Sequence, residues 1–515
     1  MKTYNIIKGI FAATVLSVVF SGCSEDAMDR INKDHGHTQS VAARFILTDV
    51  ITSTAFSNAG GDFNTYLSAY IEYEVGVDNQ LYYAETRESE PTSSSTFNNT
   101  WNGLYSTLKS ARIIINQCSE GGIDHGNYVT MAEVLAAYNC ALIADMFGDA
   151  PCSQAALIDE NGSPVYLTPK MDKQEEIYTQ AMQYLDDAIA DLQKEDLIDP
   201  EAQDLLYQGD AEKWLKLAYG LKARYTMHLL KRSANKDADM EKVLEYVNNS
   251  FESAEEQAAF DVYDANNINP LYGFFVARAG LGASESMRSK LAEYNDPRLS
   301  RAFITKQGTS GKEQAPGTAD NAVYAPNGTP EQGTSKYGTS LFMYSISAPT
   351  LLLSYHELKF LEAEALCRLE RDAKSALKDA VVAGLLNAEN SFTISRKELG
   401  KTLINAASSI TEAEAESYFD NTIEAKYTAE PLKTTMTQKY FALWGASGEA
   451  TESYNDVRRM KGLGENFIEL KNPNSFPLRC PYGNSDTTTN AEVKAAYGNG
   501  QYVYSENVWW AGGSR

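Results

Sequence analysis

Apolar residues recur at helical spacing in several long stretches of the chain. Within residues 174–192 the apolar positions are Ile177, Ala181, Tyr184, Leu185, Ala188 and Leu192. These positions follow an i, i+4, i+7, i+8, i+11, i+15 series, which gathers them on one face of an α-helix. Residues 131–146, 375–386 and 437–460 show the same kind of pattern. The periodicity therefore predicts a mainly α protein.

Capping residues mark where further helices begin. Asp210 is placed to cap a helix whose apolar face carries Trp214, Leu217, Ala218, Leu221 and Tyr225. Thr411 and Glu414 have the spacing of a capping box for another helix. A further helix is expected after Pro349, with an apolar face formed by Leu358, Leu361, Ala365 and Leu366.

Long polar stretches interrupt the helical pattern. Residues 305–340 and 470–505 are rich in Gly, Thr, Ser and Asn, and the region 55–100 is also expected to form an excursion from the scaffold. Loops of this length inside a compact protein usually carry function or are disordered. The sequence predicts a helical scaffold with large irregular loops, but the repeat consensus of tetratricopeptide proteins is absent.

The first residues have the features of an export signal. Lys2 and Lys8 accompany an apolar run at 10–20, and small residues then precede Cys23. The run is shorter than the roughly 20 apolar residues of a membrane-spanning helix, and no later segment is expected to reach that length. We therefore expect residues 1–22 to be a lipoprotein signal peptide that is removed, and Cys23 to carry the lipid. An ordinary cleaved signal with an incidental cysteine is the alternative.

The residues after the cysteine add a location. Ser24, Glu25 and Asp26 resemble the sorting signal that sends Bacteroidetes-type lipoproteins to the cell surface, although a merely polar tether would look alike. Several acyl chains on one cysteine make a stable anchor, because each buried methylene contributes about 0.8 kcal/mol. We expect a lipidated flexible tether at 23–39 and a single domain at 40–515, held at the outer membrane by lipid and exposed on the surface.

Composition and charge narrow the class of ligand. The chain is 43% hydrophobic and 11% aromatic, with 31 Tyr and 5 Trp, so many aromatic rings remain for an exposed binding surface after a core is filled. Its formal net charge is −24. Such a surface repels phosphate backbones, and nucleic-acid binding is therefore disfavoured.

Cysteine and histidine usage gives no sign of a metal or a cofactor. After the signal is removed the cysteines are Cys118, Cys140, Cys152, Cys367 and Cys480. None forms a Cys-X-X-Cys pair and the chain has 5 His, so we expect no zinc site and no cofactor. The odd number leaves at least one thiol outside any disulfide, and the sequence leaves open which of them pair. Burial as small apolar residues is the favoured interpretation.

Motifs of common enzyme classes are missing. His356 and Glu357 do not continue into His-Glu-X-X-His, residues 445–448 do not form a Gly-X-Ser-X-Gly elbow, and Gly311-Lys312 lacks the spacing of a phosphate-binding loop. Any two of the 69 acidic residues could serve glycoside hydrolysis, but no pattern selects them. We expect a protein that is not an enzyme.

Seven segments in order resemble one family. They are 101–105 (Trp-Asn-Gly-Leu-Tyr), 145–151 (Asp-Met-Phe-Gly-Asp-Ala-Pro), 177–189, 206–224, 296–299 (Asp-Pro-Arg-Leu), 357–365 and 438–459. Together they resemble the SusD/RagB-type nutrient-binding outer-membrane lipoproteins over nearly the whole mature chain. Cys480 departs from the end motif of that family, and Tyr219 lies where Asn is common.

The resemblance implies a fold and a function. The implied fold is an α-helical scaffold with tetratricopeptide-like helix pairs, long irregular loops and a few short strands. The implied function is capture of an oligosaccharide, or of a peptide, and its delivery to a SusC-like TonB-dependent transporter. A surface-anchored hydrolase and an adhesin or assembly protein remain as alternatives.

Most of the motif residues are expected to serve the scaffold. The arginines Arg224, Arg458 and Arg459 and the acids Glu362, Glu364, Glu449 and Asp456 are expected to form buried or interfacial ion pairs between helices. Asp145 and Asp149 are expected to cap a turn rather than to hold a metal.

Ligand contacts in the family come from the loops before the motif-bearing helices and from a central insertion. In this sequence those regions supply Asp78, Asn79, Tyr82, Tyr83, Trp101, Tyr324 and Tyr337. If Tyr82 and Tyr83 lie on a strand they face opposite ways, so one of them is expected to be exposed. Burial in the core is the alternative for Trp101.

Overall fold

The computed structural model describes residues 41–118, 127–159, 162–193, 201–305, 324–404 and 406–515. The chain divides into two units, Met1–Ala42 and Ala43–Arg515, and every element below belongs to the second. The expected signal peptide, Cys23 and the expected tether lie outside the described residues, as do residues 306–323 of the central polar stretch.

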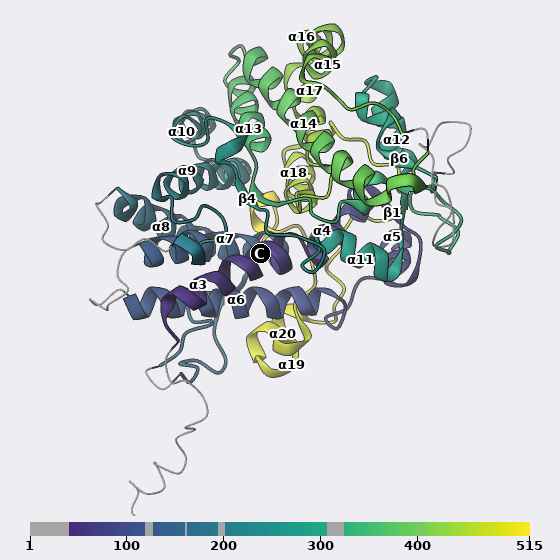
Figure 1. The fold of residues 1–515 in the computed structure, drawn as a ribbon. Coiled ribbons are helices and arrows are strands. Elements are labelled where there is room, and N and C mark those ends of the chain that lie inside the picture. Colours follow the sequence, from purple (N-terminus) through teal and green to yellow (C-terminus); the bar gives the residue numbers. More distant parts are fainter. Residues whose placement is uncertain (1–40, 119–126, 160–161, 194–200, 306–323, 405) are drawn as a thin grey trace, which may run out of the picture. The chain divides into compact units, whose positions relative to one another are not determined.

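Helices dominate the described part of the chain (Figure 1). The α-helices of the first half are α3 (Ala43–Thr52), α4 (Asp62–Tyr70), α5 (Asn79–Thr86), α6 (Phe97–Cys118), α7 (Asn127–Phe147), α8 (Gln174–Leu192), α9 (Ala211–His228), α10 (Lys236–Asn248), α11 (Pro270–Arg278) and α12 (Glu285–Glu293). Those of the second half are α13 (Tyr355–Arg368), α14 (Lys374–Leu399), α15 (Glu412–Tyr418), α16 (Glu424–Ala429), α17 (Pro431–Ala442), α18 (Ala450–Leu463), α19 (Asn484–Thr489) and α20 (Ala491–Tyr497).

Short helical turns and strands connect these helices. The π-turns are η1 (Ser53–Ala59) and η8 (Phe419–Ile423), and the 3₁₀ turns are η2 (Glu201–Gln203), η3 (Leu229–Arg232), η4 (Ala254–Glu256), η5 (Pro297–Ser300), η6 (Leu341–Tyr344), η7 (Gly400–Thr402) and η9 (Trp509–Ala511). Four antiparallel pairs join β1 (Glu74–Gly76) to β5 (Leu281–Ala283), β2 (Ala150–Pro151) to β3 (Met171–Asp172), β4 (Ala258–Phe260) to β8 (Thr350–Leu353), and β6 (Phe303–Ile304) to β7 (Thr339–Ser340).

Successive helices pack as pairs. Helix α7 packs against both α6 and α8, α8 against α9, α9 against α10, and α10 against α13, which in turn pairs with α14. Because each helix covers the apolar face of the next, the pairs share one continuous core. The predicted mainly α architecture with tetratricopeptide-like helix pairs and few short strands is confirmed.

Several local expectations are confirmed and others are wrong. The side chain of Asp210 accepts hydrogen bonds from the first turn of α9, and that of Thr411 accepts from the amide of Glu414 at the start of α15. Pro349, however, is followed by strand β8, and the helix begins only at Tyr355. The expected helix 437–460 is two helices, α17 and α18, because the glycine-containing turn between them breaks the run.

Two predicted loop regions contain helices. Residues 55–100 hold most of η1, all of α4 and α5, and the start of α6, while 470–505 hold α19 and α20. Tyr82 and Tyr83 consequently lie on helix α5 rather than on a strand, so their side chains diverge by about 100° and not by 180°.

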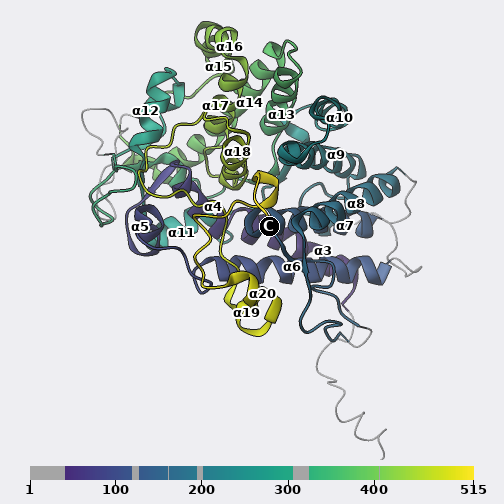
Figure 2. The same ribbon diagram turned by 180° about the vertical axis from the view of Figure 1, so that it is seen from behind.

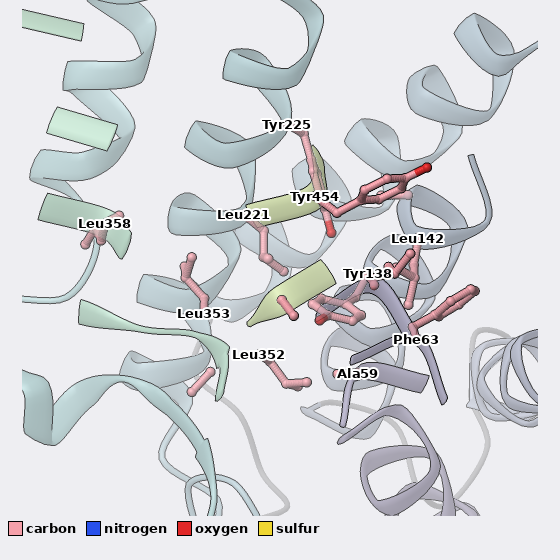
Figure 3. Close-up of a cluster of buried hydrophobic side chains, with 14 of the residues drawn as sticks. Ala59, Phe63, Tyr138, Leu142, Leu221, Tyr225, Leu352, Leu353, Leu358 and Tyr454 are labelled. Carbon is pink, nitrogen blue, oxygen red and sulfur yellow. The ribbon is translucent and has the colours of Figure 1, made fainter. Parts of the chain in front are cut away.

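Helix α7 runs through the centre of the core. All its residues from Asn127 to Phe147 are buried. It is long and apolar enough to cross a membrane, contrary to our expectation, but its burial is that of a core helix. Figure 3 shows Tyr138 and Leu142 of α7 among side chains that come from η1, α4, α9, β8, α13 and α18.

Buried charges tie α18 to this core. The guanidinium of Arg459 donates to Glu364 of α13 at 2.8 Å, which confirms the expected inter-helix pair, and to Asp456 of its own helix at 2.6 Å. The expectation for Arg458 is wrong, because Arg458 donates to the carbonyls of Asp145 and Leu478 and to Asn455. Arg224 instead pairs with Glu357, to which its Nε donates at 2.7 Å. These side chains are almost wholly buried, so removal of either partner would leave an uncompensated charge.

Other motif residues also serve the scaffold. Asp149 accepts from the amide of Gln174 at 2.9 Å and from Lys173, and thereby caps the start of α8. Figure 2 shows the C-terminal segment, in yellow, crossing the back of the helices. The backbone N–H of Cys480 donates to Met146 O at 2.8 Å. Glu362 is wrong as an inter-helix partner, because it pairs with Lys359 on its own helix.

Candidate binding site

Helices α4, α5 and α6 meet at an open pocket of about 570 Å³. We call it the aromatic pocket, and its lining residues are Tyr66, Tyr70, Gln80, Tyr83, Ala84, Ser89, Glu90, Pro91, Ser95, Thr96, Phe97 and Tyr504. Five of these side chains are aromatic rings and several of the others end in an amide, a hydroxyl or a carboxylate. Such a mixture of apolar faces and a few polar groups is typical of a small-molecule site.

The floor of the pocket is a cluster of packed rings. Tyr66 and Tyr70 are four residues apart on α4, so they lie on the same face of the helix. Both rings approach Phe97, at centroid distances of 5.9 Å and 6.3 Å. Arg87, directly after the end of α5, also holds the cluster, because it donates to Tyr70 O at 3.0 Å and lies 5.7 Å from the Tyr70 ring. Ring packing and this hydrogen bond therefore position the floor of the pocket.

Hydroxyl and amide groups are held in place around these rings. The Tyr66 hydroxyl donates to Gln80 Oε1 at 2.9 Å, and the Tyr504 hydroxyl donates to Ser89 O at 3.0 Å. Burial raises the pKa of Tyr66 to about 12, helped by the charge of Asp62, and burial also raises that of Tyr504 to about 12. Both phenols therefore stay protonated at neutral pH and offer oriented polar groups rather than charges.

Tyr83 stands at the mouth of the pocket. Its side chain is 62% exposed, although Tyr82 packs against it edge-on at a centroid distance of 5.8 Å. An exposed ring that is held by a neighbour loses little freedom when it stacks on a ligand.

A buried carboxylate fixes the helix that carries Tyr83. Glu85 is fully buried, and it accepts from the amide of Gly328 at 2.6 Å and from Asn472 Nδ2 at 3.2 Å. Burial raises the pKa of Glu85 to about 7 despite the charge of Arg87. Two segments distant in the sequence thus converge on α5 and hold it in position.

A second hollow also involves residues of α4. This neighbouring groove has an open volume of about 1060 Å³ and is lined by Phe56, Ser57, Asn58, Gly61, Asp62, Thr65, Asn99, Thr100, Gly103, Ile268, Asn269, Pro270, Gly273 and Phe274. Residues of the two linings contact one another. Thr96 of the pocket donates to Asp62 of the groove at 2.5 Å, and the Tyr66 ring of the pocket meets Phe274 of the groove edge-on at 6.4 Å.

The predicted ligand residues are only partly brought together. Asp78, Asn79, Tyr82 and Tyr83 share the start of α5, where the Asn79 amide donates to Asp78 Oδ2 at 2.7 Å. Of these only Tyr83 lines the aromatic pocket. Tyr337 lies close enough to Tyr82 for the two to interact electrostatically, but it is 93% buried by a small cluster with Val75, Val77 and Ala325.

Two other predicted contacts lie away from the pocket lining. Trp101 is fully buried, packs edge-on against Phe147 at 4.8 Å and donates its indole N–H to Asp486 at 2.6 Å. The prediction that Trp101 contacts the ligand is wrong, because Trp101 lies on the apolar face of α6, which packs into the core. Tyr324 is half-buried against Phe303, with Arg288 5.5 Å from its ring.

The sequence patterns did not predict most of the pocket. Tyr66 and Tyr70 carried the available signal, since an i, i+4 pair of tyrosines gives one helical face two rings. The prediction that residues 55–100 form a loop hid this pattern of two tyrosines on one helix face. Phe97 and Tyr504 gave no signal, because about 400 residues of chain separate them and only tertiary packing joins them. Within the described residues no group of His, Cys, Asp and Glu is arranged to hold a metal ion.

Comparison with known proteins agrees with this architecture. A family model described as starch-binding and associating with the outer membrane matches residues 36–482. The chain belongs to this SusD-like family. Its members are nutrient-binding proteins of the outer membrane rather than a family of enzymes, which agrees with the pocket of rings and polar groups.

Solved structures of SusD-like proteins share the whole fold. A SusD/RagB family protein from Bacteroides thetaiotaomicron VPI-5482 is 69% identical, with a TM-score of 0.88 over 92% of this chain and 100% of the other. A SusD homolog from Bacteroides fragilis NCTC 9343 is 19% identical, with a TM-score of 0.67 over 92% and 100%. A chitin-binding protein is 20% identical, with a TM-score of 0.70 over 92% and 99%. No curated protein sequence matches.

Proposed function

We propose that the protein captures a neutral oligosaccharide in the aromatic pocket at the cell surface. The observation that carries this proposal is the combination of the exposed Tyr83 ring with the packed rings beneath it. Sugar rings present apolar C–H faces that stack on aromatic side chains, while their hydroxyls bond to oriented amides and hydroxyls. Gln80 and Glu90 line the pocket and carry an amide and a carboxylate for such bonds.

Charge favours a neutral ligand. The chain carries a formal charge of −24, and Glu90 in the pocket and Asp62 beside it are both acidic. These negative charges would repel an anionic polysaccharide. The chitin-binding protein with the same fold handles a polymer of uncharged sugars, which fits this choice without identifying the ligand. A peptide is the competing ligand class.

Delivery and anchoring complete the proposal. The lipid on Cys23 holds the protein at the outer face of the outer membrane, and residues 24–39 form the flexible link to the domain. Bound ligand passes to a SusC-like TonB-dependent transporter that associates with the protein. The export signal in the sequence and the outer-membrane association of the family support this arrangement.

Replacement of one exposed ring tests the binding site. The unlipidated chain 24–515 is titrated calorimetrically with a panel of neutral and acidic oligosaccharides and with peptides. Tyr83→Ala is expected to raise Kd about fivefold for the preferred sugar, because one stacked ring contributes about 1 kcal/mol. Tyr166→Ala is the matched control, since Tyr166 is 44% exposed and lies outside the pocket.

The outcomes separate the alternatives. Equal effects of Tyr83→Ala and Tyr166→Ala, or binding of peptides alone, would contradict the proposed ligand. Release of shortened sugars during the titration would favour a surface hydrolase. Purification of the lipidated protein from the membrane without any accompanying barrel protein would remove the transporter from the proposal.

A further inference from the structure

Two cysteines of the core lie side by side. Cys140 is on α7 and Cys152 directly follows β2, so the turn 148–149 folds the chain back between them. Their sulfur atoms are 3.4 Å apart, and both side chains are fully buried. In this structure both are unbonded thiols. A disulfide needs about 2.0 Å between the sulfurs, so the two atoms have to approach by about 1.4 Å.

The surroundings favour ionisation of one thiol. Arg112 lies between the two segments, where it donates to Cys152 O at 2.8 Å and places Nη2 4.0 Å from Cys152 Sγ. The hydrogen bond from Cys152 lowers the pKa of Cys140, and the positive charge of Arg112 lowers it further. A thiolate is the nucleophile of thiol–disulfide exchange, and a guanidinium beside a cysteine pair stabilises it.

We propose that Cys140 and Cys152 form a disulfide bond in the exported protein, an inference that rests on the export included in the proposed function. The oxidant is a disulfide-carrying thiol oxidoreductase of the cell envelope. The Cys140 thiolate first attacks the disulfide of the oxidant, whose S–S bond breaks and releases one thiolate, so that Cys140 is held in a mixed disulfide. Cys152 then loses its proton, and its sulfur attacks the Cys140 sulfur. The bond between the two cysteines forms, the bond to the oxidant breaks, and the oxidant leaves as a thiolate.

The atoms and electrons of this step balance. Two thiols lose two protons and two electrons, and the disulfide of the oxidant takes up the electrons to become a dithiol. Because both cysteines are fully buried in the folded chain, the bond closes while this region folds. It then links α7 to the loop that follows β2, and burial shields it from reductants.

Peptide mapping tests the bond directly. The protein is taken from the membrane fraction, denatured in N-ethylmaleimide without reductant, and cleaved on the amino side of aspartates. Cleavage at Asp145 and Asp149 separates Cys140 from Cys152. We expect a linked pair of peptides about 2 Da lighter than the sum of the two free ones, replaced after reduction by two alkylated peptides.

Control residues make the result decisive. Cys480 is expected to be alkylated with or without reductant, and Cys152→Ser is expected to leave Cys140 alkylated without reductant. Recovery of both Cys140 and Cys152 as alkylated thiols from the unreduced membrane protein would overturn the inference.

Failure of export is distinguished from failure of the bond. If the protein is absent from the membrane fraction, the purified chain is refolded in a mixture of reduced and oxidised glutathione. Formation of the Cys140–Cys152 link there supports the geometry, and two alkylated thiols overturn it. Sugar binding is measured on the same samples, so loss of the proposed ligand leaves the disulfide result unaffected.

Discussion

His228 is a buried histidine that folding holds in its charged form. It lies at the end of α9 with 1% of its surface exposed, 2.8 Å from Glu452 Oε1 and 3.5 Å from Asp145 Oδ2. The Tyr178 hydroxyl is 2.9 Å from its Nδ1. Burial by itself lowers the pKa of His228, but the two carboxylates outweigh burial and raise that pKa to about 9.

This shift predicts how stability depends on pH. The unfolded pKa is near 6.5, so the folded protein binds the proton more tightly between pH 6.5 and 9. The stabilisation is fully present below pH 6.5 and is lost as the pH rises through 9. Its size is about 3 kcal/mol, from roughly 2.5 pKa units at 1.36 kcal/mol each. Solvent screening does not reduce this free energy, because the ring is almost wholly buried.

Urea unfolding of the wild type and of His228→Gln measures the effect. The free energy of unfolding is determined for both between pH 6 and 9.5. Groups such as Glu133 titrate in both proteins and cancel in the difference. We expect the wild type to be about 3 kcal/mol more stable than the variant near pH 6, with most of that advantage gone at pH 9.5.

One result would refute the reasoning about His228. A difference between the two proteins that stays constant from pH 6 to 9.5 would mean that His228 does not change its charge in this range. If His228→Gln fails to fold, NMR of labelled histidine in the wild type gives the same answer. An imidazole that titrates near 6.5 rather than near 9 would contradict the paired arrangement.

Three further changes have defined outcomes. Folding raises the pKa of Glu85 to about 7, so the free energy of unfolding of the wild type is expected to fall by about 3 kcal/mol as the pH rises from 4.5 to 7. Glu85→Gln is expected to abolish this fall, and parallel pH profiles of the two proteins in urea unfolding would argue against it. Gly148→Ala is expected to lower Tm more than Gly464→Ala. Both glycines have positive φ, but only at Gly148 would an added Cβ lie 2.9 Å from Arg515 O. Equal Tm values would show that the residues around Gly148 shift to make room for the methyl group. Cys23→Ala is expected to move the protein from the membrane to the soluble fraction in cell fractionation while sugar binding is retained; a variant that stays in the membrane would exclude this anchor.

The sequence by itself determined the class of fold and the family. Helix formation depends on spacing within one or two turns, so the stripe at 174–192 and the caps Asp210 and Thr411 predicted their helices correctly. The buried pairing of Arg459 with Glu364 could also be predicted from the sequence, because charged residues within helices that pack together need a partner of opposite charge. The helix expected directly after Pro349 was wrong, however. The residues there form strand β8, and β8 depends on pairing with the distant strand β4.

Tertiary structure alone decided the site. Nothing local distinguishes Trp101, which the core covers, from Tyr83, which it leaves exposed, because both are aromatic residues of helices. Burial depends on which distant segments pack against a helix face. Here Phe147, Tyr482 and Asp486 contact the Trp101 ring, whereas Tyr83 stays 62% exposed among the described residues. The aromatic pocket and the Cys140–Cys152 contact arise in the same way, from chain segments whose approach no spacing in the sequence records.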